Sequence, residues 1–372
     1  MTAGIPAYLD YCASAPIKRG VWEVTSALMR QTGNASSVHG FGRSQRQRVD
    51  MAREEFARRF GVKSSQVIFT SGATESNNTI LKAFPDYPVI VSSIEHPSIL
   101  NVAPEAAQIR VNRDGRVDLN HLEHLLQVLP QPALVCLMLV NNETGVIQPV
   151  MEAAKLCKNY GALLHCDAVA AVGRMLFNFN ELGADSLSLC AHKIGGPQGA
   201  GALILRAGLT IRPFIRGGGQ EMHRRAGTEN VAAIAGFSEA LRFVDEDLER
   251  GPLWLSWRES FESMIMQAAP EAVIFGQGTA RVPTISAIAM PGVSHEMQLM
   301  AFDLEGFAVS AGSACSSGKI QPSHVLNAMG TGPLAGETIR VSFGWATRKE
   351  ELENFASSWI SVYRRQRPAK VA

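Results

Sequence analysis

Short, continuous apolar runs alternate along the chain with segments in which apolar residues recur every three or four positions. The first pattern is typical of strands buried on both faces, and the second of amphipathic helices. We expect strands at residues 8–12, 67–70, 89–93, 134–140, 162–165, 184–189 and 202–205. Helices are expected at 16–29 and 43–60, from Thr74, from Ser98, from Asp118, at 150–160 and at 230–248. Apolar strands separated by helices predict a mostly parallel sheet that is covered on both faces.

Particular residues mark where some of these helices begin and end. Pro16 suits the start of the first helix, because proline fixes φ at a helical value. Gly61 is expected to end the second helix, and Asp118 to cap a later one. Thr347 and Glu350 have the spacing of a capping box, which predicts a last helix from Thr347.

The length of 372 residues allows about two domains of roughly 150 residues each. Gly251-Pro252 marks the expected boundary between a large α/β domain, residues 1–250, and a smaller α+β domain, residues 251–372. The residues before Pro16 are expected to pack on the smaller domain. In that domain we expect helices at 254–268 and 295–304, strands at 283–289 and 338–343, and a Gly/Ser-rich loop at 310–318.

Composition and charge narrow the class of protein. Apolar residues make up 46% of the chain and charged residues 19%, which is ordinary for a globular enzyme. The net charge of +1 gives no electrostatic argument for binding nucleic acid or an acidic membrane surface. The N-terminus lacks the basic and apolar regions of a signal peptide, and every apolar run is shorter than the ~20 residues that span a bilayer. We therefore expect a cytoplasmic protein.

Polar residues follow the carboxyl ends of the predicted strands, which is where an open parallel sheet binds its ligands. After the strand at 67–70, small residues lead into the N-terminus of the helix expected from Thr74. Such a turn can cradle a phosphate with backbone N–H groups, and the Thr74 hydroxyl adds a donor. Carboxylate, amide, imidazole and amine side chains follow the later strands at Glu95, His96, Asn142, Asp167, His192 and Lys193.

Lys193 stands in a Gly/Pro-rich loop between two apolar runs, an arrangement that predicts strand, loop and strand. A solvent-exposed lysine is the ordinary explanation for such a residue. The functional explanation is a desolvated amine, whose lowered pKa lets the neutral nucleophile form a Schiff base. The other polar residues at this sheet edge decide between the two.

Each of those residues also has an ordinary explanation: a tight turn before a capped helix, a core histidine at His96, a helix cap at Asp167. Their occurrence at one sheet edge fits a single ligand better, namely pyridoxal phosphate. That cofactor needs a phosphate cradle, a lysine for its aldehyde, and a carboxylate that keeps its pyridine nitrogen protonated. A histidine in the same pocket can stack on the ring or move protons.

The six cysteines include no CxxC pair and suggest no disulfide framework. Cys166 and Cys190 each neighbour a histidine, but paired metal-ligand spacing is missing and we expect no metal site. Cys315 lies in a Gly/Ser-rich loop. It is either a surface cysteine on a connector or a reactive thiol, because an exposed free thiol is otherwise a liability.

Eleven ordered motifs resemble the cysteine desulfurases of the NifS/IscS type, which are fold-type I pyridoxal-phosphate enzymes of aminotransferase class V. The motifs are Tyr8-Leu-Asp-Tyr, Gly33-Asn-Ala-Ser-Ser-Val-His, Thr70-Ser-Gly-Ala-Thr-Glu-Ser, Glu95-His, Val140-Asn-Asn-Glu-Thr-Gly, Asp167-Ala, His192-Lys, Gly217-Gly-Gly-Gln-Glu, Arg225-Ala-Gly-Thr-Glu-Asn, Ser313-Ala-Cys-Ser and Ile339-Arg-Val-Ser. Each motif alone is weakly specific. Together they cover nearly the whole chain in family order.

The resemblance implies a role for each matching residue at the cofactor. Lys193 would bind the aldehyde and move the Cα proton, Asp167 would pair with the pyridine nitrogen, and His96 would stack on the ring. The remaining cofactor contacts would be Ala73, Thr74, Asn142, Cys190, His192 and, from the partner subunit of a homodimer, Thr228.

The resemblance also implies a substrate, a nucleophile and partners. Arg340 would hold the carboxylate of L-cysteine, helped by Asn142 and Asn34, because a guanidinium fork suits that group. Cys315 would take the sulfur as a persulfide and release L-alanine. An acceptor such as an iron–sulfur scaffold protein would then receive the sulfur.

Two residues depart from the family pattern. Ala170 replaces the usual glutamine, which removes a contact to the cofactor's phenolic oxygen. Cys190 replaces the usual serine, and a thiol is a weaker hydrogen-bond donor than a hydroxyl. The alternatives are therefore a selenocysteine lyase or class V aminotransferase, and a weakly active paralogue that acts as a binding partner. Cys315 favours the desulfurase, because an aminotransferase needs no loop thiol.

Overall fold

A seven-stranded sheet forms the centre of the computed structural model, which describes residues 7–312 and 321–366. The strand order is β2-β8-β7-β6-β5-β3-β4. The bounds are β2 Val67–Thr70, β3 Val89–Ser92, β4 Ala107–Ile109, β5 Leu134–Cys136, β6 Leu163–Asp167, β7 Ser186–Cys190 and β8 Gly201–Leu205. Only β8 is antiparallel to its neighbours, so the mostly parallel sheet is confirmed.

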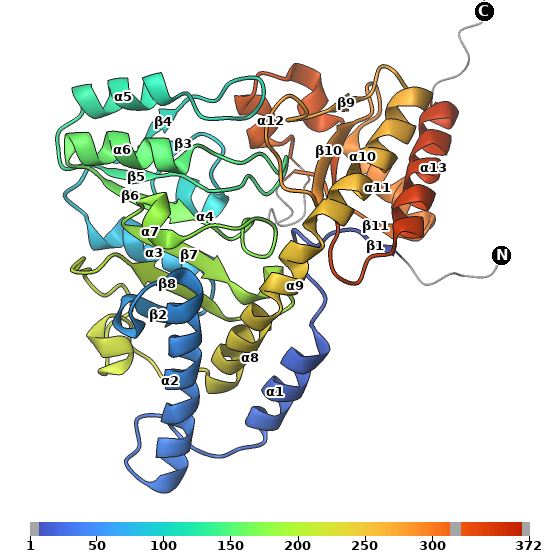
Figure 1. Ribbon diagram of the computed structural model, residues 1–372. Helices are drawn as coiled ribbons and strands as arrows, with labels where there is room; N and C mark the ends of the chain where they lie inside the picture. The colour runs from blue at the N-terminus through green and yellow to red at the C-terminus, as the bar shows by residue number, and fades with distance from the viewer. Residues whose placement is uncertain (1–6, 313–320, 367–372) are drawn as a thin grey trace, which may run out of the picture.

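Helices cover both faces of this sheet, as Figure 1 shows. Alternate residues of one strand enter two different cores: Val67 and Phe69 lie in one and Ile68 in the other. The first core is closed by α2 (Gly40–Phe60), α5 (Leu119–Val128), α6 (Val150–Tyr160) and α8 (Val231–Arg242). The second is closed by α3 (Ala73–Ala83) and α4 (Pro97–Leu100). Burial on both faces explains why the strands are continuous apolar runs.

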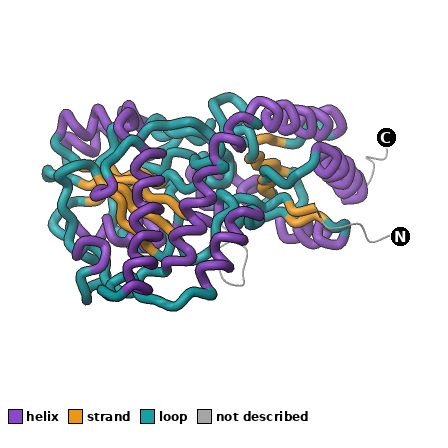
Figure 2. The backbone as a smooth tube through the Cα atoms, turned by 60° about the horizontal axis from the view of Figure 1, so that its bottom comes forward, coloured by secondary structure: helices purple, strands orange, loops and turns teal. Residues whose placement is uncertain are grey.

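The C-terminal part has a smaller antiparallel sheet and a core of its own (Figures 1 and 2). Its strands are β9 Val273–Ile274, β10 Ile285–Ala289 and β12 Thr338–Ser342, in the order β12-β10-β9. Its helices are α10 Gly251–Ala268, α11 His295–Leu304, α12 His324–Ala328 and α13 Lys349–Gln366. The first strand, β1 (Ala7–Tyr8), pairs in parallel with β11 (Phe307–Ala308). The proposed division at residue 250 stays a prediction.

Several expected element bounds were wrong. Helix α1 spans Arg19–Met29 and does not begin at Pro16, because the residues before it bond to another loop: Ala15 N–H donates to His192 O. The helix expected at 230–248 is divided at Phe243 into α8 and α9 (Val244–Glu249). The short helix α7 (Phe179–Leu182) and strand β4 were not expected.

The strand expected at 134–140 ends at Cys136. Beyond it, the backbone N–H of Met138 donates to the Glu95 side chain and not to a neighbouring strand. The last helix begins at Lys349, and Glu351 accepts the Arg348 N–H at 2.8 Å, so the capping box expected at Thr347 and Glu350 was wrong. Two predicted helix boundaries are confirmed. Gly61, in a left-handed conformation, ends α2, and Asp118 caps the start of α5.

Candidate active site

A cavity of about 480 Å³ lies at the carboxyl edge of the large sheet, between its strand ends and β12. Nine residues expected at the site line it: Ala73, Thr74, His96, Asn142, Asp167, Cys190, His192, Lys193 and Arg340. They come from six segments of the chain. The parallel topology of the sheet brings most of them to one edge, as the sequence predicted.

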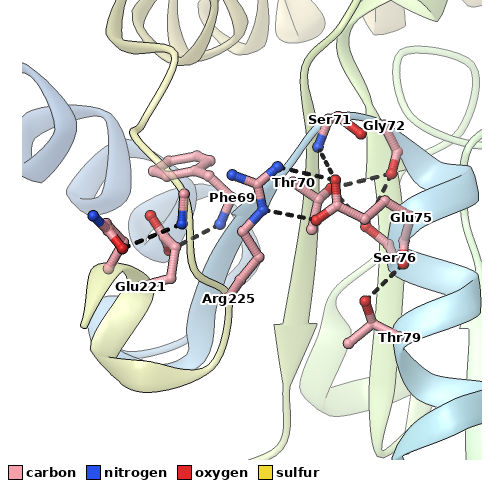
Figure 3. A network of polar contacts seen from close by, with 11 residues as sticks. Phe69, Thr70, Ser71, Gly72, Glu75, Ser76, Thr79, Glu221 and Arg225 are labelled. Atoms are coloured by element: carbon pink, nitrogen blue, oxygen red, sulfur yellow. Dashed lines mark hydrogen bonds and ion pairs between the residues drawn. The ribbon is translucent and has the colours of Figure 1, made fainter. Parts of the chain in front are cut away.

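The turn from β2 into α3 forms one wall of the cavity (Figure 3). First-turn N–H groups of a helix have no acceptor within the helix, so those of Ala73 and Thr74 are available to a ligand. A side chain on Gly72 would have no atom within 4 Å, whereas one on Gly201 would lie 2.5 Å from Gly72 Cα. The turn is therefore open toward the cavity and closely packed behind, which fits an anion cradle.

Two buried carboxylates hold this turn in place. Glu75 accepts the Ser71 N–H at 2.8 Å and pairs with Arg225 at 2.8 Å, and Figure 3 shows Arg225 pointing at it. Burial alone raises the pKa of Glu75, but the hydrogen bonds from Arg225 and Ser71 lower it overall. The negative charge that Glu75 brings to the cradle is therefore balanced by Arg225.

Glu221 is the second carboxylate, and it accepts the Phe69 N–H at 3.0 Å (Figure 3). It also makes a two-armed ion pair with Arg53, with both N–O distances at 2.8 Å. Glu221 and the next two residues have left-handed backbone conformations, with φ of 48°, 56° and 62°. The segment from Glu221 to Arg225 is thus fixed to both ends of the cradle.

Asp167, at the end of β6, is held by a buried polar network that the sequence did not reveal. Asn77 Nδ2 donates to Asp167 Oδ2 at 2.9 Å and to Ser98 Oγ at 2.8 Å, while Asn77 Oδ1 contacts His165 Nε2 at 3.0 Å. Burial lowers the pKa of His165 to about 3, so His165 is neutral near pH 7. The Asp167 carboxylate is consequently oriented by a neutral amide and not by a cation.

Lys193 ends a short helical turn (Ala191–Lys193) that follows β7. Its Nζ donates to the backbone carbonyls of Cys12 and Ala13, the latter at 2.9 Å. Burial lowers the pKa of Lys193, partly offset by the nearby Cys190 and Cys12 thiols. A desolvated amine with a lowered pKa is suited to nucleophilic and proton-transfer chemistry.

The imidazoles beside Lys193 favour the neutral form. Burial lowers the pKa of His192 to about 4, and that of His96 is lowered by burial despite the nearby Asp167. His96 Nδ1 accepts the Ser98 N–H at 3.1 Å, which caps α4. Cys190 lies 3.8 Å from His192 Nε2, and burial raises the pKa of its thiol to about 12. Cys190 is therefore a neutral thiol.

Arg340 projects from β12 into the opposite side of the cavity. Its Nη1 donates to the Asn142 carbonyl at 3.2 Å, and its Nη2 to Asp10 Oδ1 at 2.7 Å. Burial acts to lower the pKa of Arg340, but the neighbouring Cys12 and Asp10 raise it overall. The buried Nε has no hydrogen-bond partner among residues 7–312 and 321–366. The guanidinium is thus charged, oriented and able to bind an anion in the cavity.

Two expected residues, Asn34 and Thr228, do not line this cavity. Asn34 is exposed and accepts the Ser36 N–H at 2.8 Å, and Thr228 is also exposed. Cys315 lies outside the residues that the structure describes. Ala170, which departs from the family pattern, does line the cavity.

Other features of the described residues concern metals and membranes. No group of three or more potential metal-ligating side chains occurs in residues 7–312 and 321–366. Within the same ranges, no helix combines the length and apolar character needed to cross a bilayer. The five cysteines in these ranges are buried free thiols.

Comparisons with known proteins identify the family of the chain. The aminotransferase class-V family profile matches residues 7–355. A curated relative, "Cysteine desulfurase IscS" of Dictyoglomus turgidum, is 39% identical over 364 residues, covering 93% of this chain and 91% of the relative. The structure of a NifS-like protein from Rickettsia africae superposes with a TM-score of 0.90 at 36% identity, over 96% of this chain and 99% of that one.

A second solved structure, "SspA in complex with cysteine", superposes with a TM-score of 0.78 at 27% identity, over 91% of this chain and 98% of that one. The fold of this chain agrees with that of both solved structures. The chain therefore belongs to the aminotransferase class-V family, among the cysteine desulfurases of the IscS/NifS type.

Proposed function

We propose that the protein is a pyridoxal-phosphate-dependent cysteine desulfurase that converts L-cysteine to L-alanine and transfers the sulfur to Cys315. The observation that carries the proposal is one cavity lined by a buried lysine, a strand-end carboxylate, an anion cradle and a buried arginine. The relatives named as cysteine desulfurases support the same activity.

The residues at the cavity fit the cofactor. The Gly72 turn leaves space and N–H groups for its phosphate, and the Asp167 carboxylate can face a protonated pyridine nitrogen. We propose that Ala73, Thr74, Asn142, Cys190 and His192 complete the contacts and that His96 stacks on the ring. When bound, pyridoxal phosphate supplies an electron sink that stabilises negative charge at the substrate Cα.

Lys193 is proposed to hold the cofactor covalently and, once free, to move the Cα proton. Its burial supports both roles, because a lowered pKa keeps a useful fraction of the amine neutral. The carbonyls of Cys12 and Ala13 accept hydrogen bonds from Nζ and can stabilise it while it carries a proton. The neutral His192 adds no positive charge beside it.

Arg340 is proposed to bind the substrate carboxylate, with Asn142 at the same wall of the cavity. A buried guanidinium with an unpartnered Nε is suited to a carboxylate, which accepts two parallel hydrogen bonds. We propose Asn34 as a further contact from a partner subunit, since it is exposed in the single chain.

Cys315 is proposed as the sulfur acceptor. Its thiolate attacks the substrate sulfur, the carbon–sulfur bond breaks, and the carbon takes up a proton to give L-alanine while Cys315 becomes a persulfide. Ser310, five residues before Cys315, exchanges backbone hydrogen bonds of 2.6 and 3.2 Å with Arg340. Five residues can extend up to ~17 Å, so the thiol is within reach of a substrate held by Arg340.

We further propose a homodimer that passes sulfur to an acceptor such as an iron–sulfur scaffold protein. Val38 and Phe41 are 88% and 69% exposed, which is unusual for large apolar side chains close in sequence to a predicted site residue, Asn34. Exposed Thr228 would then reach the cofactor phosphate of the partner subunit. The free thiols are typical of a reducing compartment, which supports a cytoplasmic location.

The test is alanine release from L-cysteine by the cofactor-loaded protein, with a thiol reductant present to discharge the persulfide. We expect Lys193→Ala to lose both the cofactor absorbance band and alanine production. Cys315→Ser should keep the band and lose sulfur transfer. Robust desulfuration by Cys315→Ser would contradict the nucleophile assignment. No alanine from a protein that binds the cofactor would favour another substrate or a weakly active paralogue.

A further inference from the structure

The residues from Leu9 to Ala13 run between β11 and β12, and we call this segment the N-terminal strap. Leu9 N–H donates to Ala308 O at 2.9 Å, and Leu9 O accepts the Ser342 N–H at 2.8 Å. Tyr11 N–H then donates to Ser342 O at 3.1 Å. The backbone of the strap is therefore fixed on both sides where it passes the cavity.

The Asp10 carboxylate lies at the centre of the strap and has two partners. Arg340 Nη2 donates to Oδ1 at 2.7 Å, and Ser310 Oγ donates to Oδ2 at 2.6 Å. The Asn142 carbonyl accepts from the other terminal nitrogen of Arg340. Two acceptors on different elements thus fix the plane of a guanidinium whose side chain is only 3% exposed.

We propose that Asp10 is a positioning residue for substrate-carboxylate recognition: it holds the Arg340 guanidinium in the orientation that a carboxylate in the cavity requires. The inference rests on the proposed function of Arg340. Nothing in the composition or local pattern of the strap suggests it, because Asp10 and Arg340 are 330 residues apart in sequence.

Asp10 could instead weaken substrate binding, since its carboxylate competes with the substrate carboxylate for the Arg340 guanidinium. The geometry favours positioning. Each terminal nitrogen of Arg340 carries two protons, and Asp10 and the Asn142 carbonyl each accept one, so one proton on each nitrogen stays available to a carboxylate. Recognition of a carboxylate by arginine depends on a fixed fork more than on charge alone, and a pre-oriented fork loses less freedom on binding.

The test is the dissociation constant of L-alanine from the cofactor-loaded protein, followed by the cofactor absorbance band. In Asp10→Ala, which removes the acceptor of the Arg340 bond, we expect L-alanine to bind about tenfold more weakly, the usual effect of losing one hydrogen bond to a charged group. Ethylamine, which keeps the amine but lacks the carboxylate, should bind Asp10→Ala and wild type equally well. This pair of ligands separates a carboxylate effect from general damage to the site.

Two further variants complete the test. Tyr8→Phe removes hydroxyl hydrogen bonds to the Asp10 and Ser14 carbonyls, so it weakens the strap without touching Arg340 and should leave L-alanine binding unchanged. Adding Asp10→Ala to Arg340→Lys should have no further effect. If Asp10→Ala fails to fold, Ser310→Ala should weaken L-alanine binding in the same direction, because it releases the other carboxylate oxygen.

Three outcomes would overturn the proposal: unchanged or tighter L-alanine binding in Asp10→Ala, an equal loss for ethylamine, or an equal loss in Tyr8→Phe. The titration does not depend on desulfuration. A wild-type protein that binds L-alanine but makes none from L-cysteine would therefore refute the proposed function and leave this inference open to the same test.

Discussion

The network behind Asp167 gives a sharp prediction for Asn77→Leu. Leucine has a similar volume but no polar atoms, so the change removes three buried hydrogen bonds without opening a large cavity. The bond to the Asp167 carboxylate is worth about 1.5–3 kcal/mol, and those to Ser98 and His165 about 0.5–1.5 kcal/mol each. We expect the free energy of unfolding to fall by about 4 kcal/mol, the sum of these three losses.

The neighbouring Asn78 provides a matched control. It lies on the same helix, is half-buried, and makes one hydrogen bond of 3.0 Å, to the Ser98 carbonyl. Asn78→Leu should therefore lower the free energy of unfolding by only about 1 kcal/mol. The assay is urea unfolding of the cofactor-free proteins at one protein concentration, with an unchanged slope required for the comparison.

A functional readout accompanies the stability measurement. Asp167 loses its orienting amide in Asn77→Leu, so the dissociation constant of pyridoxal phosphate should rise in that variant and stay near the wild-type value in Asn78→Leu. The reasoning would be refuted if the two variants differed by less than about 1 kcal/mol in stability. Equal cofactor affinity in both would refute the positioning of Asp167 by Asn77.

Three other predictions follow from the site. Gly201→Ala puts a methyl group 2.5 Å from the Gly72 backbone, so it should destabilise the protein by about 1–3 kcal/mol and weaken cofactor binding. The control is Gly251→Ala, whose methyl group meets no atom within 4 Å and should change neither property. Glu221→Ala leaves Arg53 buried without its ion-pair partner, so the free energy of unfolding in urea should fall by about 3–5 kcal/mol. Glu239→Ala, which removes the more exposed ion pair with Arg242, should lower it by at most about 1 kcal/mol. His165 has a folded pKa of about 3, below its ordinary value near 6.5, so the unfolded chain binds the extra proton as the pH falls. Between pH 7 and pH 5 the wild type should therefore lose about 2 kcal/mol more of its unfolding free energy than His165→Asn, and an equal loss in both would contradict a neutral buried His165.

The sequence predicted the part of the site that depends on the parallel sheet. Ala73, Asp167 and Lys193 all follow apolar runs, and the rule that strand ends meet at one edge is enough to bring them together. Arg340 came from the family resemblance alone, because an arginine inside a short apolar strand carries no local signal of its own. The position of Cys315 stays a prediction, since it lies outside the described residues.

The residues that hold the site residues in place, Asn77 and Asp10, could not be predicted from the positions of strand ends. Asn77 lies on a polar turn of α3, where an exposed side chain was the natural expectation, yet it is fully buried against Asp167. Asp10 acts on a residue at the far end of the chain. Such contacts depend on how distant elements pack, and periodicity describes only how one element faces its core.

The N-terminal strap gives a physical reason why the chain's first and last parts belong to one site. Lys193, from the large sheet, donates to the carbonyls of Cys12 and Ala13, and Arg340, from the small sheet, pairs with Asp10. Four successive residues, 10–13, therefore include hydrogen-bond partners of both Lys193 and Arg340. Any shift of the strap along β12 would move both sets of acceptors together, so the separation of Lys193 from Arg340 depends on the register between the strap and Ser342.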